Sequence, residues 1–134
     1  MIVVDTNIIA HLYLSSRHSP QAELVLQKDC EWAAPTLWRS EFRNVLALYL
    51  RKALVDVPTA WTIMDAAEAR MSGFEYEVIS SEVLQLAAQS GCSAYDCEFV
   101  ALAKNLGVQL VTVDNQVLTQ FPESAVSPEK FLMH

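Results

Sequence analysis

Apolar residues follow two alternating patterns along the chain, short continuous runs and longer stretches with apolar positions three or four residues apart. Strands are predicted at the largely apolar segments Ile2–Val4, Trp32–Ala34 and Val108–Val113, and at Glu75–Ile79, which contains two glutamates. Because strands alternate with helical stretches, we expect a parallel sheet with helices on both faces. The pattern therefore predicts an α/β fold, a three-layer α/β/α sandwich around a central, mainly parallel sheet.

Residues that favour helix ends bound the helical stretches. Ser19 fits an N-cap with Pro20 in the first turn, Ser93 fits another N-cap, and Gly73 and Gly107 fit helix C-termini. The predicted helices cover residues 6–13, 19 onward, about 36–53, 58–73, 81–90, 93–106 and 117–120, with a weak edge strand near residue 126. No linker or repeat interrupts the alternation, which predicts a single domain over residues 1–134.

Composition narrows the class of protein. The apolar fraction of 52% is too high for a disordered chain. The longest apolar run, Val45–Leu50, is too short to cross a bilayer, and the first residues lack the basic region of a signal peptide. The three cysteines form no CxxC pair, which favours free thiols in a reducing compartment. We therefore expect a cytoplasmic protein that does not enter the membrane.

The distribution of charge does not decide whether the chain binds nucleic acid. A net charge of -7 argues mildly against a large phosphate-contacting surface, although a bound divalent cation would reverse the local sign. Four of the nine basic residues fall on one predicted helix, and two of them, Arg39 and Arg43, lie two residues from Glu41. They should therefore face away from Glu41. A solvated face is the expected role, with a distal nucleic-acid backbone or an acidic partner as the alternative.

Four carboxylates stand where an apolar residue or a simple cap is expected. Asp5 and Asp114 each end an apolar run, Glu41 interrupts a helical apolar stripe, and Asp96 begins another. Strand-end acids of a parallel sheet lie at one edge, and acids near helix N-termini can reach it. Burying several carboxylates together requires a cation, and oxygen-only ligands favour Mg²⁺ or Mn²⁺. Such a site supports phosphodiester hydrolysis.

Each acid also has an ordinary structural interpretation. Asp5 fits an N-cap, Ser93 and Asp96 fit a capping box, and Asp114 fits a turn or cap. Glu41 is harder to explain in this way, because it lies on the apolar face of its helix. A coincidence of all four is much less probable than any one of them.

Four short motifs in order resemble one known family. They are Ile2–Asn7, with an acid followed by Thr and Asn; Glu41 on a helix after a short strand and Pro35; Ser93–Asp96 followed by Phe99–Ala103; and Leu110–Asp114, with Thr two residues before the acid. Together they resemble the PIN-domain nucleases, and within them the VapC-like toxins of toxin–antitoxin pairs. The resemblance covers essentially the whole chain.

This resemblance implies an activity and its participants. It implies a metal-dependent endoribonuclease that cleaves tRNA or rRNA and leaves a 3′-hydroxyl and a 5′-phosphate. Mg²⁺ or Mn²⁺ would be held by the four acids, while Asn7 and Thr112 would orient carboxylates or contact the phosphate. A cognate antitoxin and a homodimer are also implied. Some family members carry a further acid after the fourth, where this chain has Gln116, so one-metal and two-metal sites both remain open.

Two other functions and one surface remain alternatives. A non-catalytic PIN-fold binding module would keep the fold without turnover. A receiver-type signalling domain needs adjacent acids after its first strand, and here Thr6 follows Asp5. Trp61, Met64 and Met71 form an apolar helical stripe that we assign by default to the core. The alternative is a groove for an antitoxin segment or a second subunit.

Overall fold

The computed structural model describes residues 1–134. Its sheet has five strands in the order β3-β2-β1-β4-β5, and all four neighbouring pairs are parallel. The strands are β1 (Ile2–Val4), β2 (Trp32–Pro35), β3 (Glu75–Tyr76), β4 (Leu110–Val111) and β5 (Ala125–Val126). The predicted α/β sandwich with a central parallel sheet is thus confirmed.

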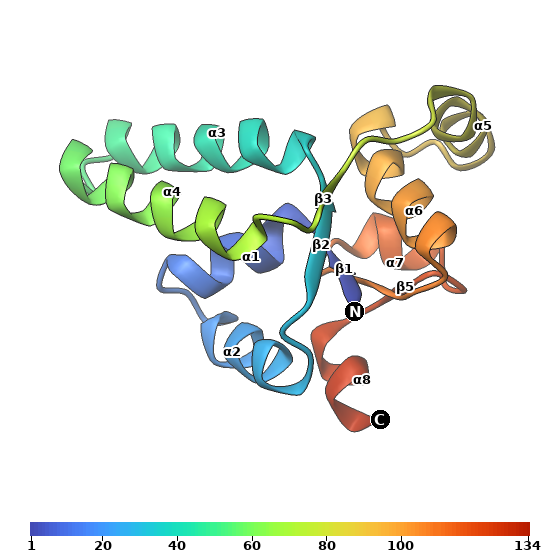
Figure 1. The fold of residues 1–134 in the computed structure, drawn as a ribbon, viewed down its shortest axis with the longest axis horizontal. Helices are drawn as coiled ribbons and strands as arrows, with labels where there is room; N and C mark the ends of the chain where they lie inside the picture. Colours follow the sequence, from blue (N-terminus) through green and yellow to red (C-terminus); the bar gives the residue numbers. More distant parts are fainter.

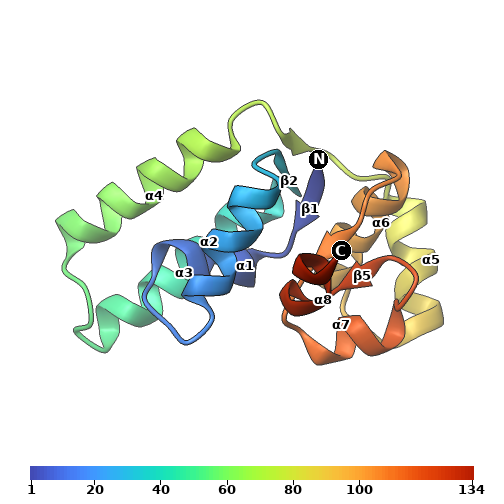
Figure 2. The same cartoon turned by 90° about the horizontal axis from the view of Figure 1, so that it is seen from below.

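Eight helices cover the sheet. They are α1 (Thr6–Tyr13), α2 (Ser19–Lys28), α3 (Leu37–Arg51), α4 (Val57–Met71), α5 (Ser80–Ser90), α6 (Ala94–Leu106), α7 (Asn115–Gln120) and α8 (Pro128–Met133). Helices α1 to α4 lie on one side of the sheet and α5 to α7 on the other, while α8 packs against α2 (Figures 1 and 2). Connections between parallel strands are right-handed. The chain adds β2 and β3 on one side of β1 and β4 and β5 on the other, so the helices of these two sets of connections cover opposite faces of the sheet.

The core follows directly from this layering. Thirty buried residues form one cluster that includes all of β1 and β4. Both faces of these strands are covered, which is why their sequences are continuous apolar runs rather than alternating ones. From α3, Trp38 and Phe42 are fully buried, with ring centroids 6.2 Å apart. No helix combines the length and apolar character needed to cross a bilayer.

Some predicted boundaries differ from the structure. Strand β3 stops at Tyr76 rather than residue 79, because its only neighbour, β2, turns into α3 after Pro35. Strand β4 is shorter than predicted at both ends, and beyond it the Val113 N–H donates to the Asn7 side chain at 3.3 Å. Helix α8 was not predicted, although Ser127 caps it by accepting a hydrogen bond from the Lys130 N–H.

The predicted N-cap at Ser19 is wrong. Helix α2 begins at Ser19 itself, and the preceding His18 makes no side-chain cap. The Ser19 hydroxyl accepts from the Ser16 N–H at 2.9 Å and donates to the Leu14 carbonyl at 3.0 Å. It therefore stabilises the turn between α1 and α2. The predicted cap at Ser93 is confirmed, because its hydroxyl accepts from the Asp96 N–H at 3.1 Å.

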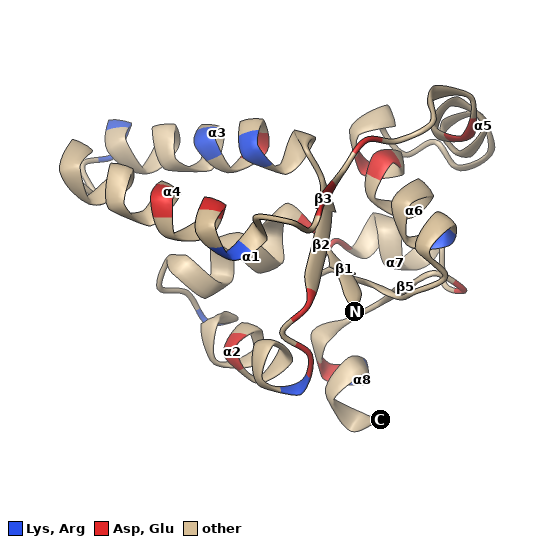
Figure 3. Cartoon of the chain, viewed as in Figure 1, with Lys and Arg blue, Asp and Glu red and all other residues tan.

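Two surface assignments also change. Arg39 does not lie on a solvated face: its Nε donates to Glu75 at 2.6 Å, and its guanidinium also pairs with Glu68. Figure 3 shows basic residues along α3 and acidic ones along α4 beside it. Trp61 is 67% exposed and so lies outside the core, whereas Met71 from the same stripe is fully buried.

Candidate active site

The site lies where the strand order reverses. From β1 the chain builds β2 and β3 on one side and then places β4 and β5 on the other. At such a switch point the carboxyl ends of two adjacent strands leave a crevice between diverging connections. Asp5 directly follows β1, and Asp114 lies three residues beyond β4. The strand arrangement therefore brings these two acids to the same edge.

A threonine joins the first acid to the second. The Thr6 N–H donates to Oδ1 of Asp5 at 2.8 Å, and the Thr6 hydroxyl donates to Oε1 of Glu41 at 2.7 Å. Thr6 and Asp5 are buried, and Glu41 is half-buried on α3. One residue in the first turn of α1 thus fixes two carboxylates from different elements. Asp5 also serves as the N-cap of α1, so its capping and site interpretations are compatible.

A second threonine joins the first acid to the fourth. The Thr112 hydroxyl is fully buried and donates to Oδ2 of Asp5 at 2.8 Å, while the Asp114 N–H donates to Thr112 Oγ1 at 3.0 Å. The Asn7 amide donates to the same hydroxyl at 3.2 Å and approaches Asp5 Oδ2 at 3.4 Å. Asn7 and Thr112 therefore contact the Asp5 carboxylate, as their predicted orienting role requires. Asp114 also caps α7.

The acids also influence one another electrostatically, which changes the pKa values of three of them. Burial raises the pKa of Asp5 to about 7 and outweighs the hydrogen bonds from Thr112 and Thr6, which lower this pKa. Glu41 and Asp96 add smaller upward contributions. Burial also raises the pKa of Glu41, and Asp96 raises it further. The pKa of Asp96 is raised by burial and then by Asp114. Each of the four acids is thus close enough to repel at least one of the others.

Two residues of this neighbourhood were missed in the sequence. Thr6 was assigned only to a family motif, although it contacts two carboxylates. Glu98 has its pKa raised by burial and then by Glu41, which places it beside the second acid. No spacing rule indicates Glu98, because it lies two residues after Asp96 and so on a different face of α6. Its proximity to Glu41 depends on how α6 faces α3.

The donor set fits a hard divalent cation by its chemistry. Asp5, Glu41, Asp96 and Asp114 offer carboxylate oxygens only, the ligands that Mg²⁺ and Mn²⁺ favour. Their mutual repulsion is the electrostatic condition that a cation would relieve. No three His, Cys, Asp or Glu side chains are arranged closely enough to form a ready-made metal site. The residues fit the ion in type and charge.

The fold and these acids define a class, α/β proteins with a carboxylate-rich site at the switch point of a parallel sheet. Residues 2–123 match the family model described as PIN domain. This chain belongs to the PIN-domain family, which confirms the resemblance indicated by its motifs. The receiver-type alternative loses its support.

Similar proteins agree with this assignment. Ribonuclease VapC3 of Pyrobaculum aerophilum is 29% identical over 124 residues, which cover 90% of this chain and 95% of that protein. The crystal structure of PAE2754 from Pyrobaculum aerophilum has a TM-score of 0.78 at 22% identity, with 98% of this chain and 93% of that chain covered. A toxin–antitoxin complex from Klebsiella pneumoniae gives 0.69 at 15% identity, over 96% and 98%. The likeness to these structures shows a shared fold.

Proposed function

We propose that this chain is a metal-dependent endoribonuclease, the toxin of a toxin–antitoxin pair, that hydrolyses phosphodiester bonds in cytoplasmic tRNA or rRNA. The observation that carries the proposal is the gathering of Asp5, Glu41, Asp96 and Asp114 at the switch point of a PIN-domain sheet. The similarity to Ribonuclease VapC3 over nearly the whole chain supports the substrate class. The alternative is a binding module of the same fold that has no catalytic activity.

The four acids would hold Mg²⁺ or Mn²⁺, which supplies Lewis-acid activation of water and neutralises charge on the scissile phosphate. The chain itself fixes the carboxylates before substrate arrives, since Thr6 and Thr112 together occupy both oxygens of Asp5. Glu41 is only half-buried, and its raised pKa suits a group that accepts a proton from the attacking water. Asn7 positions Asp5 and the backbone at Val113.

Cleavage of total tRNA and rRNA by the purified chain tests the proposal. The assay is run with Mg²⁺, with Mn²⁺ and with EDTA, beside Asp96→Asn and a control, Asp65→Asn, at a position on the exposed surface of α4. Discrete fragments that require metal, persist in the control and disappear in Asp96→Asn are expected. Absence of cleavage together with absence of Mn²⁺ binding would favour the non-catalytic binding module.

We also propose an antitoxin partner and a homodimer. The Klebsiella pneumoniae neighbour is a toxin–antitoxin complex, which supports a protein partner. Trp61 lies exposed beside a cavity of about 290 Å³ between α3 and α4, lined also by Leu46, Leu50 and Met64. Exposed Trp and Met are common anchors of protein interfaces. If this surface mediates assembly, Trp61→Ala should lower the mass measured by light scattering or abolish antitoxin co-purification without changing the melting temperature.

A further inference from the structure

A second polar cavity adjoins the acids on the side away from Glu41 and Asp96. It has a volume of about 440 Å³, and its walls include Val113 and Asn115, the residues on either side of Asp114. The opposite wall is formed by the start of α2 and the start of α8. In Figure 1, α2 and α8 lie in the lower part of the view, and α3 and α6 lie in the upper part. The cavity therefore extends the site along the sheet edge.

Arg17 gives this cavity a free cation. Its Nε donates to Nε2 of His18 at 3.2 Å, and it pairs with no carboxylate, so its terminal nitrogens are available. The His18 ring packs against His11, with centroids 4.7 Å apart, and His11 Nδ1 lies 2.7 Å from the Ser16 hydroxyl. This chain of contacts orients the guanidinium. Arg39, in contrast, is already paired with two glutamates.

The far wall supplies hydrogen-bond acceptors. Glu129 is exposed at the start of α8, and its pKa is lowered by a hydrogen bond to its own N–H and further by Gln21, Ser127 and His18. It is therefore an ionised acceptor at neutral pH. Asn115 adds a side-chain amide, which can both donate and accept. A cation and a carboxylate face one cavity, so its polarity is mixed rather than purely phosphate-binding.

Mixed polarity of this kind matches the edge of one nucleobase. Guanine presents O6 and N7 as acceptors, for which arginine is the usual partner, and it carries N–H donors on its Watson–Crick edge that a carboxylate can accept. Adenine reverses this pattern, with an amino donor where guanine has O6. An imidazole ring or a guanidinium plane also offers a stacking surface for an unstacked base. The His18–Arg17 pair provides both.

We propose that the cavity between Arg17, His18, Asn115 and Glu129 holds a guanine of the RNA beside the scissile phosphate and thereby selects the cleavage site. This inference rests on the proposed ribonuclease function and assigns its base specificity. In this arrangement Arg17 donates to guanine O6 and N7, and Glu129 accepts from its N–H groups. Because Asn115 directly follows Asp114, a base held here belongs to the nucleotide next to the reacting phosphate.

The first measurement is cleavage of uridine oligonucleotides that carry one guanosine, inosine or adenosine at a fixed position. A bidentate base contact discriminates by about tenfold or more, so kcat/KM should favour guanosine over adenosine by that factor. Inosine, which lacks the 2-amino group, should fall between them. Arg17→Ala and Glu129→Gln should reduce the preference to about twofold or less.

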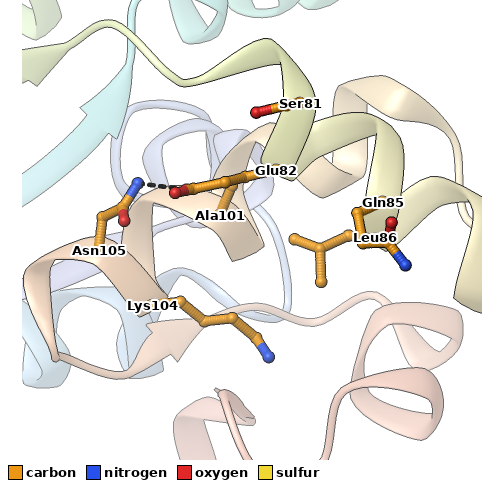
Figure 4. Close-up of a pocket in the computed structure, with 7 residues that line it drawn as sticks. All are labelled: Ser81, Glu82, Gln85, Leu86, Ala101, Lys104 and Asn105. Atoms are coloured by element: carbon orange, nitrogen blue, oxygen red, sulfur yellow. Dashed lines mark hydrogen bonds between the residues drawn. The ribbon is translucent and has the colours of Figure 1, made fainter.

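A different polar cavity, on the other side of the sheet, provides matched controls. It measures about 480 Å³, lies between α5 and α6, and contains Glu82, Lys104 and Asn105 (Figure 4). There Asn105 donates to Glu82 at 2.7 Å, so the two groups satisfy one another. Lys104 lies two helical turns beyond Asp96, about 12 Å along α6. Lys104→Ala and Glu82→Gln remove the same charges as the test variants and should leave the guanosine preference unchanged.

The second measurement separates this inference from the ribonuclease function. The ¹⁵N-labelled chain is titrated in EDTA with guanosine 5′-monophosphate and with adenosine 5′-monophosphate, which differ only in the base. The amide signals of Arg17, Asn115 and Glu129 should shift at a guanosine monophosphate concentration about tenfold lower than the adenosine monophosphate concentration that shifts them. This result would support the base pocket even if no RNA is cleaved. Equal shifts with both nucleotides, or none at these residues, would overturn it. Cleavage without base preference would overturn the assignment to substrate RNA.

Discussion

At Asp5, burial and the neighbouring acids raise the pKa from 3.8 to about 7, so the folded chain retains a proton that the unfolded chain releases. Between about pH 4 and pH 7 the folded state therefore binds more protons than the unfolded state, and the free energy of unfolding falls as the pH rises. Ionisation of Asp5 in the metal-free chain therefore lowers the free energy of unfolding at neutral pH. A bound divalent cation would remove this destabilisation.

Asp5→Asn should therefore stabilise the metal-free chain at pH 8 by on the order of 4 kcal/mol while abolishing RNA cleavage. The gain should shrink to below about 1 kcal/mol near pH 4, because there Asp5 is protonated in the folded state and partly protonated in the unfolded state. Urea unfolding in EDTA at the two pH values measures it, with Asp65→Asn on the exposed surface of α4 as the control. A gain that does not change between pH 4 and pH 8 would contradict the assignment of the raised pKa to Asp5.

Thr6→Val keeps the shape of a buried side chain but removes the hydroxyl that donates to Glu41. Residues that orient metal-binding carboxylates typically contribute about 10- to 100-fold to activity, so kcat/KM should fall within that range. The Thr6 hydrogen bond lowers the pKa of Glu41, so its removal should raise this pKa and move the acidic limb of the pH–rate profile to higher pH. Thr62→Val, on the exposed surface of α4, is the control. An unshifted acidic limb would exclude this role for Thr6.

Arg39 connects three elements, because it lies on α3 and its partners Glu68 and Glu75 lie on α4 and β3. Its hydrogen bonds lower the pKa of Glu75 below 4.5, assisted by the Trp38 Nε1–H at 2.8 Å. The contribution of Glu75 to stability is therefore present above pH 4.5 and is lost as the pH falls through its folded value. The pairing fixes the edge strand β3, which has only one neighbour in the sheet.

Arg39→Ala should lower the free energy of unfolding by about 1–2 kcal/mol at pH 7, since it leaves a partly buried Glu75 without its charged donor. The loss should be smaller at pH 3, because the contribution of the ionised Glu75 to stability declines as the pH falls below 4.5. Thermal or urea unfolding of both proteins at the two pH values provides the comparison. Arg43→Ala, an exposed position on the same helix, should change stability by less than about 0.5 kcal/mol. Equal losses for the two variants would exclude the network.

Across the whole molecule, the four acids come from the residue after β1, from α3, from α6 and from the segment after β4. Their repulsion opposes the packing that brings these elements together, so ions bound among them should stabilise the fold. Mg²⁺ or Mn²⁺ at about 100 times the dissociation constant should add about 2.7 kcal/mol to the free energy of unfolding. EDTA should reverse the effect, and NaCl of equal ionic strength should not reproduce it. An equal gain in Asp96→Asn would argue against binding at these acids.

The sequence by itself determined the fold class, singled out the four carboxylates and indicated two of the residues that contact the first of them. Runs and stripes of apolar residues are local properties of the backbone period, so they specified β1, β2 and most helices. The acids stood out because each breaks such a pattern. Asn7 and Thr112 followed from the same motifs, and the structure places both against Asp5.

Only the tertiary structure decided how segments distant in sequence face one another. It placed the Thr6 hydroxyl on Glu41, 35 residues away, and Glu98 beside the same acid. It paired Arg39 with two glutamates and left Trp61 exposed, contrary to what the helical spacing predicted for both. It also brought Arg17 and Glu129 to one cavity. Helical period specifies which side chains share a face, whereas the crossing of elements in the packed fold specifies what that face meets.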